Sequence, residues 1–150
     1  MNINATTAPL TLASIAGGNY GSTVNLQGGN AITIQGTVAN TSNGSLDLYV
    51  NGGTTVTMQG SSTRLNINNY LSWHVASGQL NVNNAGALAG DYGSIYSANE
   101  LQLTGGNLDN TSSGDLTENN NPQIAVNNNF TFVGTHSLNL GTRAVTLGGS

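Results

Sequence analysis

The chain has 150 residues, a formal net charge of −4 and only 5% charged residues, against about a quarter in an average soluble domain. With two arginines and no lysine it cannot neutralise a row of phosphates, so we expect no binding to nucleic acid and no contact with anionic membrane surfaces. The absence of cysteine excludes disulfides, zinc knuckles and thiol nucleophiles. Residues 1–4 lack the basic and apolar stretches of a signal peptide, and no apolar run approaches the roughly 18 residues of a membrane span.

Apolar residues alternate with polar ones in very short bursts, which predicts an all-β chain. No segment has apolar residues at helical spacing over a dozen positions, and the abundant Gly, Asn, Ser and Thr are poor helix formers. Turn-forming residues separate the bursts. In chain order the predicted strands are 24–26, 32–34, 46–50, 56–58, 65–67, 80–82, 101–103, 124–126, 130–132, 138–140 and 145–147.

The spacing of the bursts favours a parallel β-helix (β-solenoid) with three short strands per coil. The pattern apolar-x-apolar-Gln-Gly occurs at 24–28, 32–36 and 56–60, with offsets of 8 and 24 that correspond to one side and one coil. The Gly-Gly-Asn sequence at 28–30 returns at 105–107, close to three coils later. We predict a right-handed parallel β-helix of about six three-sided coils, forming a rod roughly 30 Å long. A β-sandwich or jelly roll is the alternative.

Two segments depart from the regular plan. Residues 15–150 form the predicted solenoid, whereas residues 1–14 form an N-terminal extended segment that could add as a strand to a neighbouring subunit. The least regular stretch, 83–99, predicts an enlarged corner loop.

Asparagine is the most frequent residue, and two readings explain it. The runs 119–121 and 127–129 are eight residues apart, which predicts successive corners of one coil. Asparagines at equivalent corners could stack their side-chain amides into hydrogen-bonded ladders. Alternatively, asparagine is present only because it favours turns.

The last third of the chain resembles a known family. Gly-Gly-Asn-Leu-Asp-Asn-Thr-Ser at 105–112 is followed by Asn-Asn-Pro-Gln at 120–123, by the run 129–142, and by Ala-Val-Thr-Leu-Gly-Gly at 144–149. This succession resembles the autotransporter-associated β-strand repeat proteins, which are large secreted bacterial proteins with passengers predicted to be right-handed parallel β-helices. Arg143 departs from the small residue usual after Leu-Gly-Thr. The resemblance covers about 45 residues; it implies a bacterial surface location and supplies no catalytic motif.

Three carboxylates, Asp109, Asp115 and Glu118, form the only acidic grouping. A glycosidase needs two carboxylates at a defined separation, and oxygen-rich corners can bind calcium. Asp109 and Asp115, however, flank Asn, Ser and Gly residues, where aspartate is a common turn former. We therefore expect a protein that is not an enzyme and has no catalytic residue, cofactor or metal site.

The remaining candidates are isolated side chains. His74 and His136 lie 62 residues apart with no acid at ligand spacing, so no metal site is expected. Trp73 belongs to the core if it shares the face of its apolar neighbours, and otherwise could stack on a sugar or a partner. Threonine pairs such as 55–57 raise the possibility of ice binding, but the pairs do not recur at the coil period.

The ends of the predicted solenoid suggest a function. Neither terminus offers the helix or charged cap that protects the open ends of most solenoids. Head-to-tail contact between such ends does not close, so it generates a filament. We predict a non-catalytic extracellular or cell-surface structural protein that partners with itself in a head-to-tail homopolymer. The alternative is an autotransporter passenger fragment acting as a monomeric adhesin that binds a glycan or a cell surface.

Overall fold

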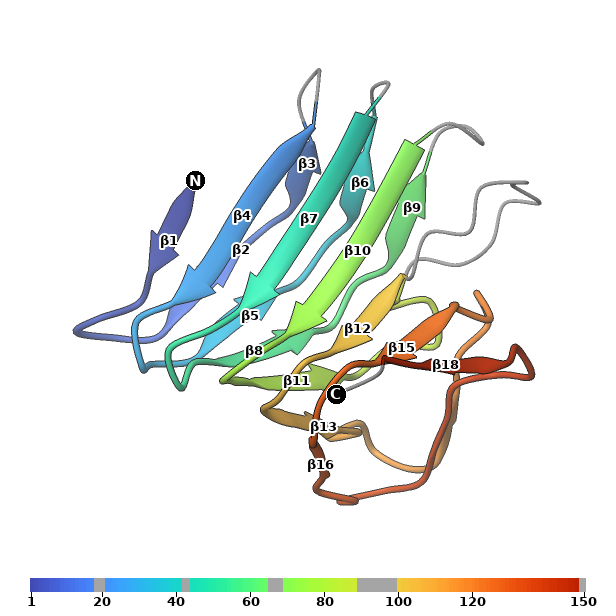
Figure 1. Cartoon of the computed structure of the whole chain (residues 1–150). Helices are drawn as coiled ribbons and strands as arrows, with labels where there is room; N and C mark the ends of the chain where they lie inside the picture. The colour runs from blue at the N-terminus through green and yellow to red at the C-terminus, as the bar shows by residue number, and fades with distance from the viewer. Residues whose placement is uncertain (18–20, 42–43, 65–68, 89–99, 149–150) are drawn as a thin grey trace.

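The computed structural model describes residues 1–17, 21–41, 44–64, 69–88 and 100–148, and every regular element in these ranges is a β-strand (Figure 1). The strands are two to seven residues long because each alternating burst soon meets a glycine- or asparagine-rich turn.

The strands assemble into four parallel sheets on three sides of the molecule. The first sheet runs β1 (Asn2–Asn4), β4 (Ser22–Gln27), β7 (Gly44–Val50), β10 (Asn69–Val75), β12 (Leu101–Leu103), β15 (Ile124–Val126) and β18 (Val145–Leu147). The second runs β2 (Leu10–Leu12), β5 (Ile32–Ile34), β8 (Thr55–Met58), β11 (Gln79–Val82), β13 (Asn107–Asp109) and β16 (Thr131–Phe132). The third side holds β3 (Ile15–Gly17), β6 (Val38–Asn40) and β9 (Ser62–Arg64), and a separate pair, β14 (Leu116–Thr117) and β17 (Leu138–Asn139).

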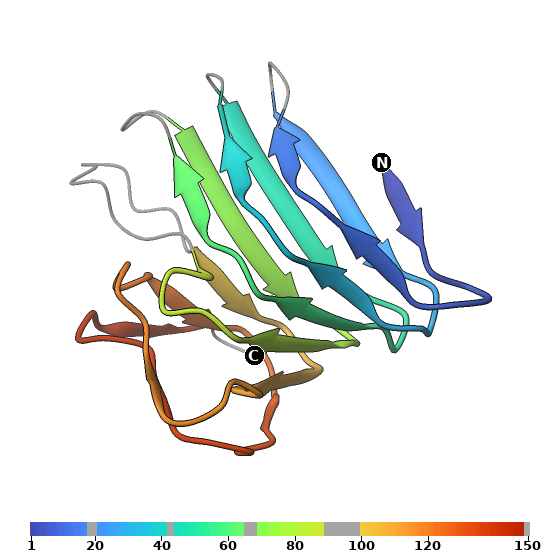
Figure 2. The same ribbon diagram turned by 180° about the vertical axis from the view of Figure 1, so that it is seen from behind.

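This architecture is a parallel β-solenoid, so the predicted fold class is confirmed and the sandwich alternative is wrong. Paired strands lie one coil apart, with offsets from 21 residues (Ile124↔Val145) to 28 (Trp73↔Leu101). Among the described residues the chain returns to the first sheet six times, and five of these coils carry a strand on every side. Figures 1 and 2 show the stack from opposite directions.

The register agrees with the repeats found in the sequence. Ile32 of β5 pairs with Val56 of β8, so the 24-residue repeat spans one coil. The glycine corners at 28–30 and 105–107 follow β4 and β12, which lie three coils apart in the first sheet. The predicted strand 65–67 and residues 89–99 of the predicted corner loop lie outside the described residues.

Residues 1–14 contribute to the first coil. Asn2 of β1 pairs with Asn25 of β4, and Leu10 of β2 pairs with Ile32 of β5. β3, which starts at Ile15, supplies the third side of this coil, so the predicted boundary at residue 14 does not coincide with a break in the solenoid. The role of this segment in binding a neighbouring subunit stays a prediction.

The core consists of apolar columns that run along the stack. In the first sheet, one inward column is formed by Val24, Leu48, Trp73, Leu101 and Ile124, and the other by Leu26, Val50, Val75, Leu103 and Val126. Trp73 is fully buried, and its indole Nε1 donates to Ser62 Oγ at 3.3 Å. The core position of Trp73 is therefore confirmed.

Close contact between successive corners explains two of the glycines. Gly28 has φ +117°, and a Cβ at this residue would collide with the backbone of Ala5 in the preceding coil. A Cβ at Gly60 would overlap the carbonyl of Gly36, its counterpart one coil earlier. Only glycine lets these corners stack at the strand spacing.

Asparagine amides do stack between coils, but on strands β1 and β4 and just after β7 rather than at equivalent corners, and other asparagines serve turns. Asn51 Nδ2 donates to Asn25 Oδ1 at 3.1 Å, and Asn25 Nδ2 donates to Asn2 Oδ1 at 2.9 Å, which makes a three-rung amide ladder. At the turns, asparagine instead bridges backbone carbonyls. Asn110 Nδ2, for example, donates to Gly114 O at 2.9 Å and to Ser137 O, in the next coil, at 2.7 Å.

Candidate functional site

Both arginines of the chain lie against a single carboxylate, that of Glu100. Arg64 ends β9, Glu100 precedes β12 and Arg143 precedes β18, so the three residues come from different coils. Arg64 Nη2 is 3.6 Å from Glu100 Oε1, and Arg143 Nη1 is 3.9 Å from Glu100 Oε2. The Arg64 and Glu100 side chains are almost completely buried. We call these three residues the Glu100 cluster.

Polar groups of the surrounding coils complete the Glu100 cluster. The Gln123 backbone N–H donates to Glu100 Oε2, Arg64 Nη1 donates to Asn69 O at 3.3 Å, and Arg143 Nη2 donates to Gln123 Oε1 at 3.4 Å. Burial raises the pKa of Glu100, although the Gln123 N–H and the two guanidinium groups favour the charged form. Because the carboxylate is enclosed, its role is to hold coils together.

Sequence reasoning missed the Glu100 cluster. Arg64 and Glu100 are 36 residues apart, and Arg143 stood out only as a departure from the family pattern. The one usable signal was that a chain nearly free of cations keeps two arginines. Buried charges persist where they are paired.

The structure gives the acids of the predicted grouping separate partners. Asp109 Oδ1 accepts from Thr135 N at 2.9 Å, and its Oδ2 accepts from Thr135 Oγ1 at 2.7 Å. Although burial acts to raise the pKa of Asp109, these hydrogen bonds outweigh it and the net shift is downward. Asp115 Oδ1 accepts from Ser137 N at 3.0 Å. Both aspartates therefore fix the turns of the following coil.

Glu118 faces the other way, toward the preceding coil. Its Oε1 accepts from Leu88 N at 3.1 Å, while its Oε2 is buried without a hydrogen-bond partner. Glu118 is only 3% exposed, and burial raises its pKa to about 8 although backbone N–H groups, that of Leu88 first, act against the shift. This residue is therefore mostly a neutral acid at pH 7.

One histidine belongs to a polar cluster on the outer face of the first sheet. The rings of Tyr49 and His74, which are in register on β7 and β10, stack at 4.1 Å with an interplanar angle of 9°. His74 Nε2 lies 3.2 Å from Asp47 Oδ1, and this hydrogen bond lowers the pKa of Asp47. His136 lies after β16, outside this cluster. In the described ranges no group of three or more His, Asp or Glu side chains is placed to hold a metal ion.

Threonine does recur at the coil period on the second sheet, but only as one column with a single threonine per coil. Thr11, Thr33 and Thr57 are in register on β2, β5 and β8. Asn81 continues this column, since its Nδ2 donates to Thr57 Oγ1 at 3.1 Å. The column lacks the second, parallel row that a Thr-x-Thr surface requires.

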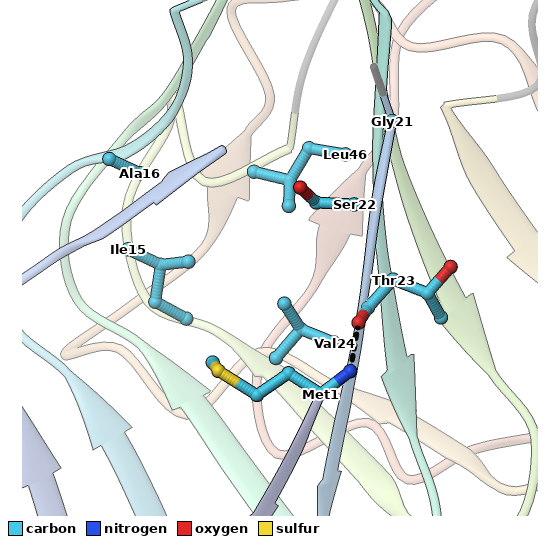
Figure 3. A pocket seen from close by; sticks show the side chains of 8 residues that line it. All are labelled: Met1, Ile15, Ala16, Gly21, Ser22, Thr23, Val24 and Leu46. Carbon is cyan, nitrogen blue, oxygen red and sulfur yellow. Dashed lines mark hydrogen bonds between the residues drawn. The ribbon is translucent and has the colours of Figure 1, made fainter. Parts of the chain in front are cut away.

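The two ends of the solenoid are hollowed and apolar. The N-terminal hollow, of about 350 Å³, lies beside Met1, whose ammonium group donates to Thr23 O at 2.7 Å (Figure 3). Its lining residues are Met1, Ile15, Ala16, Gly21, Ser22, Thr23, Val24 and Leu46. The C-terminal hollow, of about 110 Å³, is lined by Leu108, Phe130, Phe132, Leu138 and Leu140.

The fold alone defines the class of this protein, a parallel β-solenoid. Comparison of the chain with protein-family models, curated proteins and solved structures finds no match. Over the described part of the chain, no helix is long and apolar enough to cross a membrane.

Proposed function

We propose that the protein is a non-catalytic structural β-solenoid subunit that self-assembles end to end into a filament. The position of its exposed apolar side chains carries this proposal. Within the described residues, the large exposed apolar side chains are Met1, Phe132, Val133, Val145 and Leu147, which all lie in the first coil or at the C-terminal end. Among the described residues, the sides of the stack lack such side chains, so association through apolar contact is favoured at the ends.

The distribution of charge supports the same arrangement. All six acidic side chains lie between residues 47 and 118, and the N-terminal 46 residues contain no charged side chain. The only charged side chain after residue 118 is Arg143, which is directed to Glu100. Two copies meeting end to end would therefore bring together surfaces with few charged side chains. Repulsion between net charges, which keeps most soluble proteins apart, is weak at this contact.

The placement of the carboxylates supports a structural role. Glu100, Asp109, Asp115 and Glu118 all accept hydrogen bonds from the backbone of another coil. Each such bond fixes one coil relative to another, as a stack of short repeats requires. The resemblance to the autotransporter-associated repeats supports a location outside the bacterial cell, on the surface or secreted.

Electron microscopy and light scattering of the purified protein test the proposal. We expect rods many times longer than a single subunit, and isolated particles at high concentration would refute it. Replacing the exposed Leu147 by Asp places a charge at the C-terminal edge and should abolish the rods while the β circular dichroism remains. Thr63→Asp, on the exposed side of β9, is the matched control and should leave assembly intact.

The runner-up function is that of a monomeric adhesin, a passenger fragment whose sides bind a glycan or a cell surface. The stacked Tyr49 and His74 rings favour it, because they place aromatic and polar groups together on the outer face of the first sheet. Glycan binding by particles that stay monomeric would support this function over the filament.

A further inference from the structure

We propose that the filament junction is a parallel strand pair between β18 of one copy and β1 of the next, in the register Val145↔Met1, Thr146↔Asn2 and Leu147↔Ile3. This inference rests on the proposed function. It specifies which strands of a second copy of the chain meet and how they align.

The register follows from the columns of the first sheet. Asn2 stands at one end of the column that runs through Asn25, and Thr146 stands at the other end, next to Ala125. The register through β4, β7, β10, β12 and β15 joins Asn25 to Ala125. When Asn2 of a second copy lies opposite Thr146 of β18, it therefore continues this outward column.

The inward columns impose the same alignment. Ile3 pairs with Leu26 at one end of the stack, and Leu147 pairs with Val126 at the other, so both belong to one apolar column. A shift by a single residue would turn Leu147 or Ile3 to the outer face, since strand side chains alternate. The apolar columns thus select the proposed register over its nearest neighbours.

Both strands have an open edge. In the described part of the chain β18 pairs only with β15, and β1 pairs only with β4. Leu147 is 76% exposed and Met1 72% exposed, so the apolar side chains at both edges are largely in contact with water. Pairing the strands would satisfy the backbone groups of both edges and cover these side chains.

The other sides of the stack accommodate this junction through side-chain packing. The first sheet has seven strands and the second six, so joining copies through the first sheet leaves the second one strand short. The C-terminal hollow lies at this position and contains Phe130 and Phe132, the only phenylalanines of the chain. At the opposite end, β2 presents the half-buried Leu10 and Leu12. We therefore place the phenylalanine rings against these leucines of the next copy.

Disulfide trapping tests the register, because the natural chain has no cysteine. Adjacent strands lie about 4.8 Å apart, within the Cα separation of about 4.4 to 6.8 Å that a disulfide allows. The double variant Asn2→Cys/Thr146→Cys should give, on oxidation, a ladder of linked oligomers on a non-reducing gel. The control Asn4→Cys/Thr146→Cys keeps both cysteines on the outer face but separates them by two further residues, so it should give no ladder.

Light scattering of the unmodified protein shows whether the protein self-assembles at all, independently of the proposed register. If the protein assembles but the control variant alone forms the ladder, or neither variant does, the β18–β1 register is wrong and self-assembly stands. If the unmodified protein stays monomeric, both proposals fail.

Discussion

Glu118 should make the stability of this protein fall as pH rises from 4.5 to 8. Its ordinary pKa is 4.5, and burial in the folded chain raises this pKa to about 8. Below pH 4.5 the folded and unfolded chains both hold the proton, so the residue contributes no pH dependence. Between the two values the unfolded chain releases the proton while the folded chain retains it, which favours unfolding. Above pH 8 both forms are charged and the loss levels off.

The size of the effect follows from the two pKa values. One pKa unit corresponds to about 1.4 kcal/mol, so a rise from 4.5 to about 8 sets a ceiling of about 5 kcal/mol. Rearrangement around the charged carboxylate lowers this figure, and we expect a loss on the order of 2 to 3 kcal/mol between pH 5 and pH 8.

The variant Glu118→Gln should remove this decline. Its amide cannot ionise, and its Oε1 can still accept the hydrogen bond from Leu88 N. At pH 5 the variant and the natural protein should differ little in their free energy of unfolding. At pH 8 the variant should be more stable by on the order of 2 to 3 kcal/mol.

Urea unfolding followed by the fluorescence of Trp73, the only tryptophan, measures the effect at several pH values. Asp109→Asn is the contrasting control, since the lowered pKa of Asp109 means that its stabilising contribution is fully present above its ordinary value of 3.8 and is lost at lower pH. Its cost should thus stay constant from pH 5 to 8. Parallel pH curves for Glu118→Gln and the natural protein would refute the reasoning.

Two further predictions concern the stack itself. Glu100→Gln leaves two guanidinium groups without their carboxylate. It should lower the free energy of unfolding by roughly 3 kcal/mol, as breaking a buried ion pair does. A loss below about 1 kcal/mol in urea unfolding would contradict the role of the Glu100 cluster. Gly60→Ala should cost at least about 1 kcal/mol because its Cβ meets the Gly36 carbonyl. Gly114→Ala should be tolerated, because a Cβ added there would meet no atom within 4 Å beyond its chain neighbours. Equal melting temperatures for the two alanine variants would argue against the close corner.

The predicted strands match many of those with apolar inward positions, but they omit β2 and β10, whose inward residues include Leu12 and Leu71. Ile32 and Val56 show why this works, because the two-residue alternation and the 24-residue repeat both follow from the geometry of one coil. The third side contains strands that the apolar alternation did not predict. Its strands β6 and β9 turn buried polar residues inward, namely Asn40, Ser62 and Arg64, so the apolar alternation fails there.

The Glu100 cluster was beyond sequence reasoning for a related reason. Its contacts depend on how β10 aligns with β12. The offset between these strands is the longest in the stack, 28 residues from Trp73 to Leu101. A repeat length taken from other coils places Glu100 several residues away from its true position. Asp109, which ends β13, and Asp115 lie on either side of the predicted turn, but their partners Thr135 and Ser137 become visible only once the next coil is in place.

Polar residues in the core explain why the short coils form a single stack with one register. On the third side one column changes from Gly17 to Asn40 to Arg64 in successive coils, and Arg64 meets Glu100. Apolar columns alone would tolerate a shift of two residues between neighbouring coils, because such a shift keeps the same face of each strand inward. A buried ion pair tolerates no such shift, since it would leave a charge unpaired. The Glu100 cluster thus fixes the register of the middle coils, and Arg143 is the only charged side chain outside residues 47–118, which suits the end-to-end assembly proposed above.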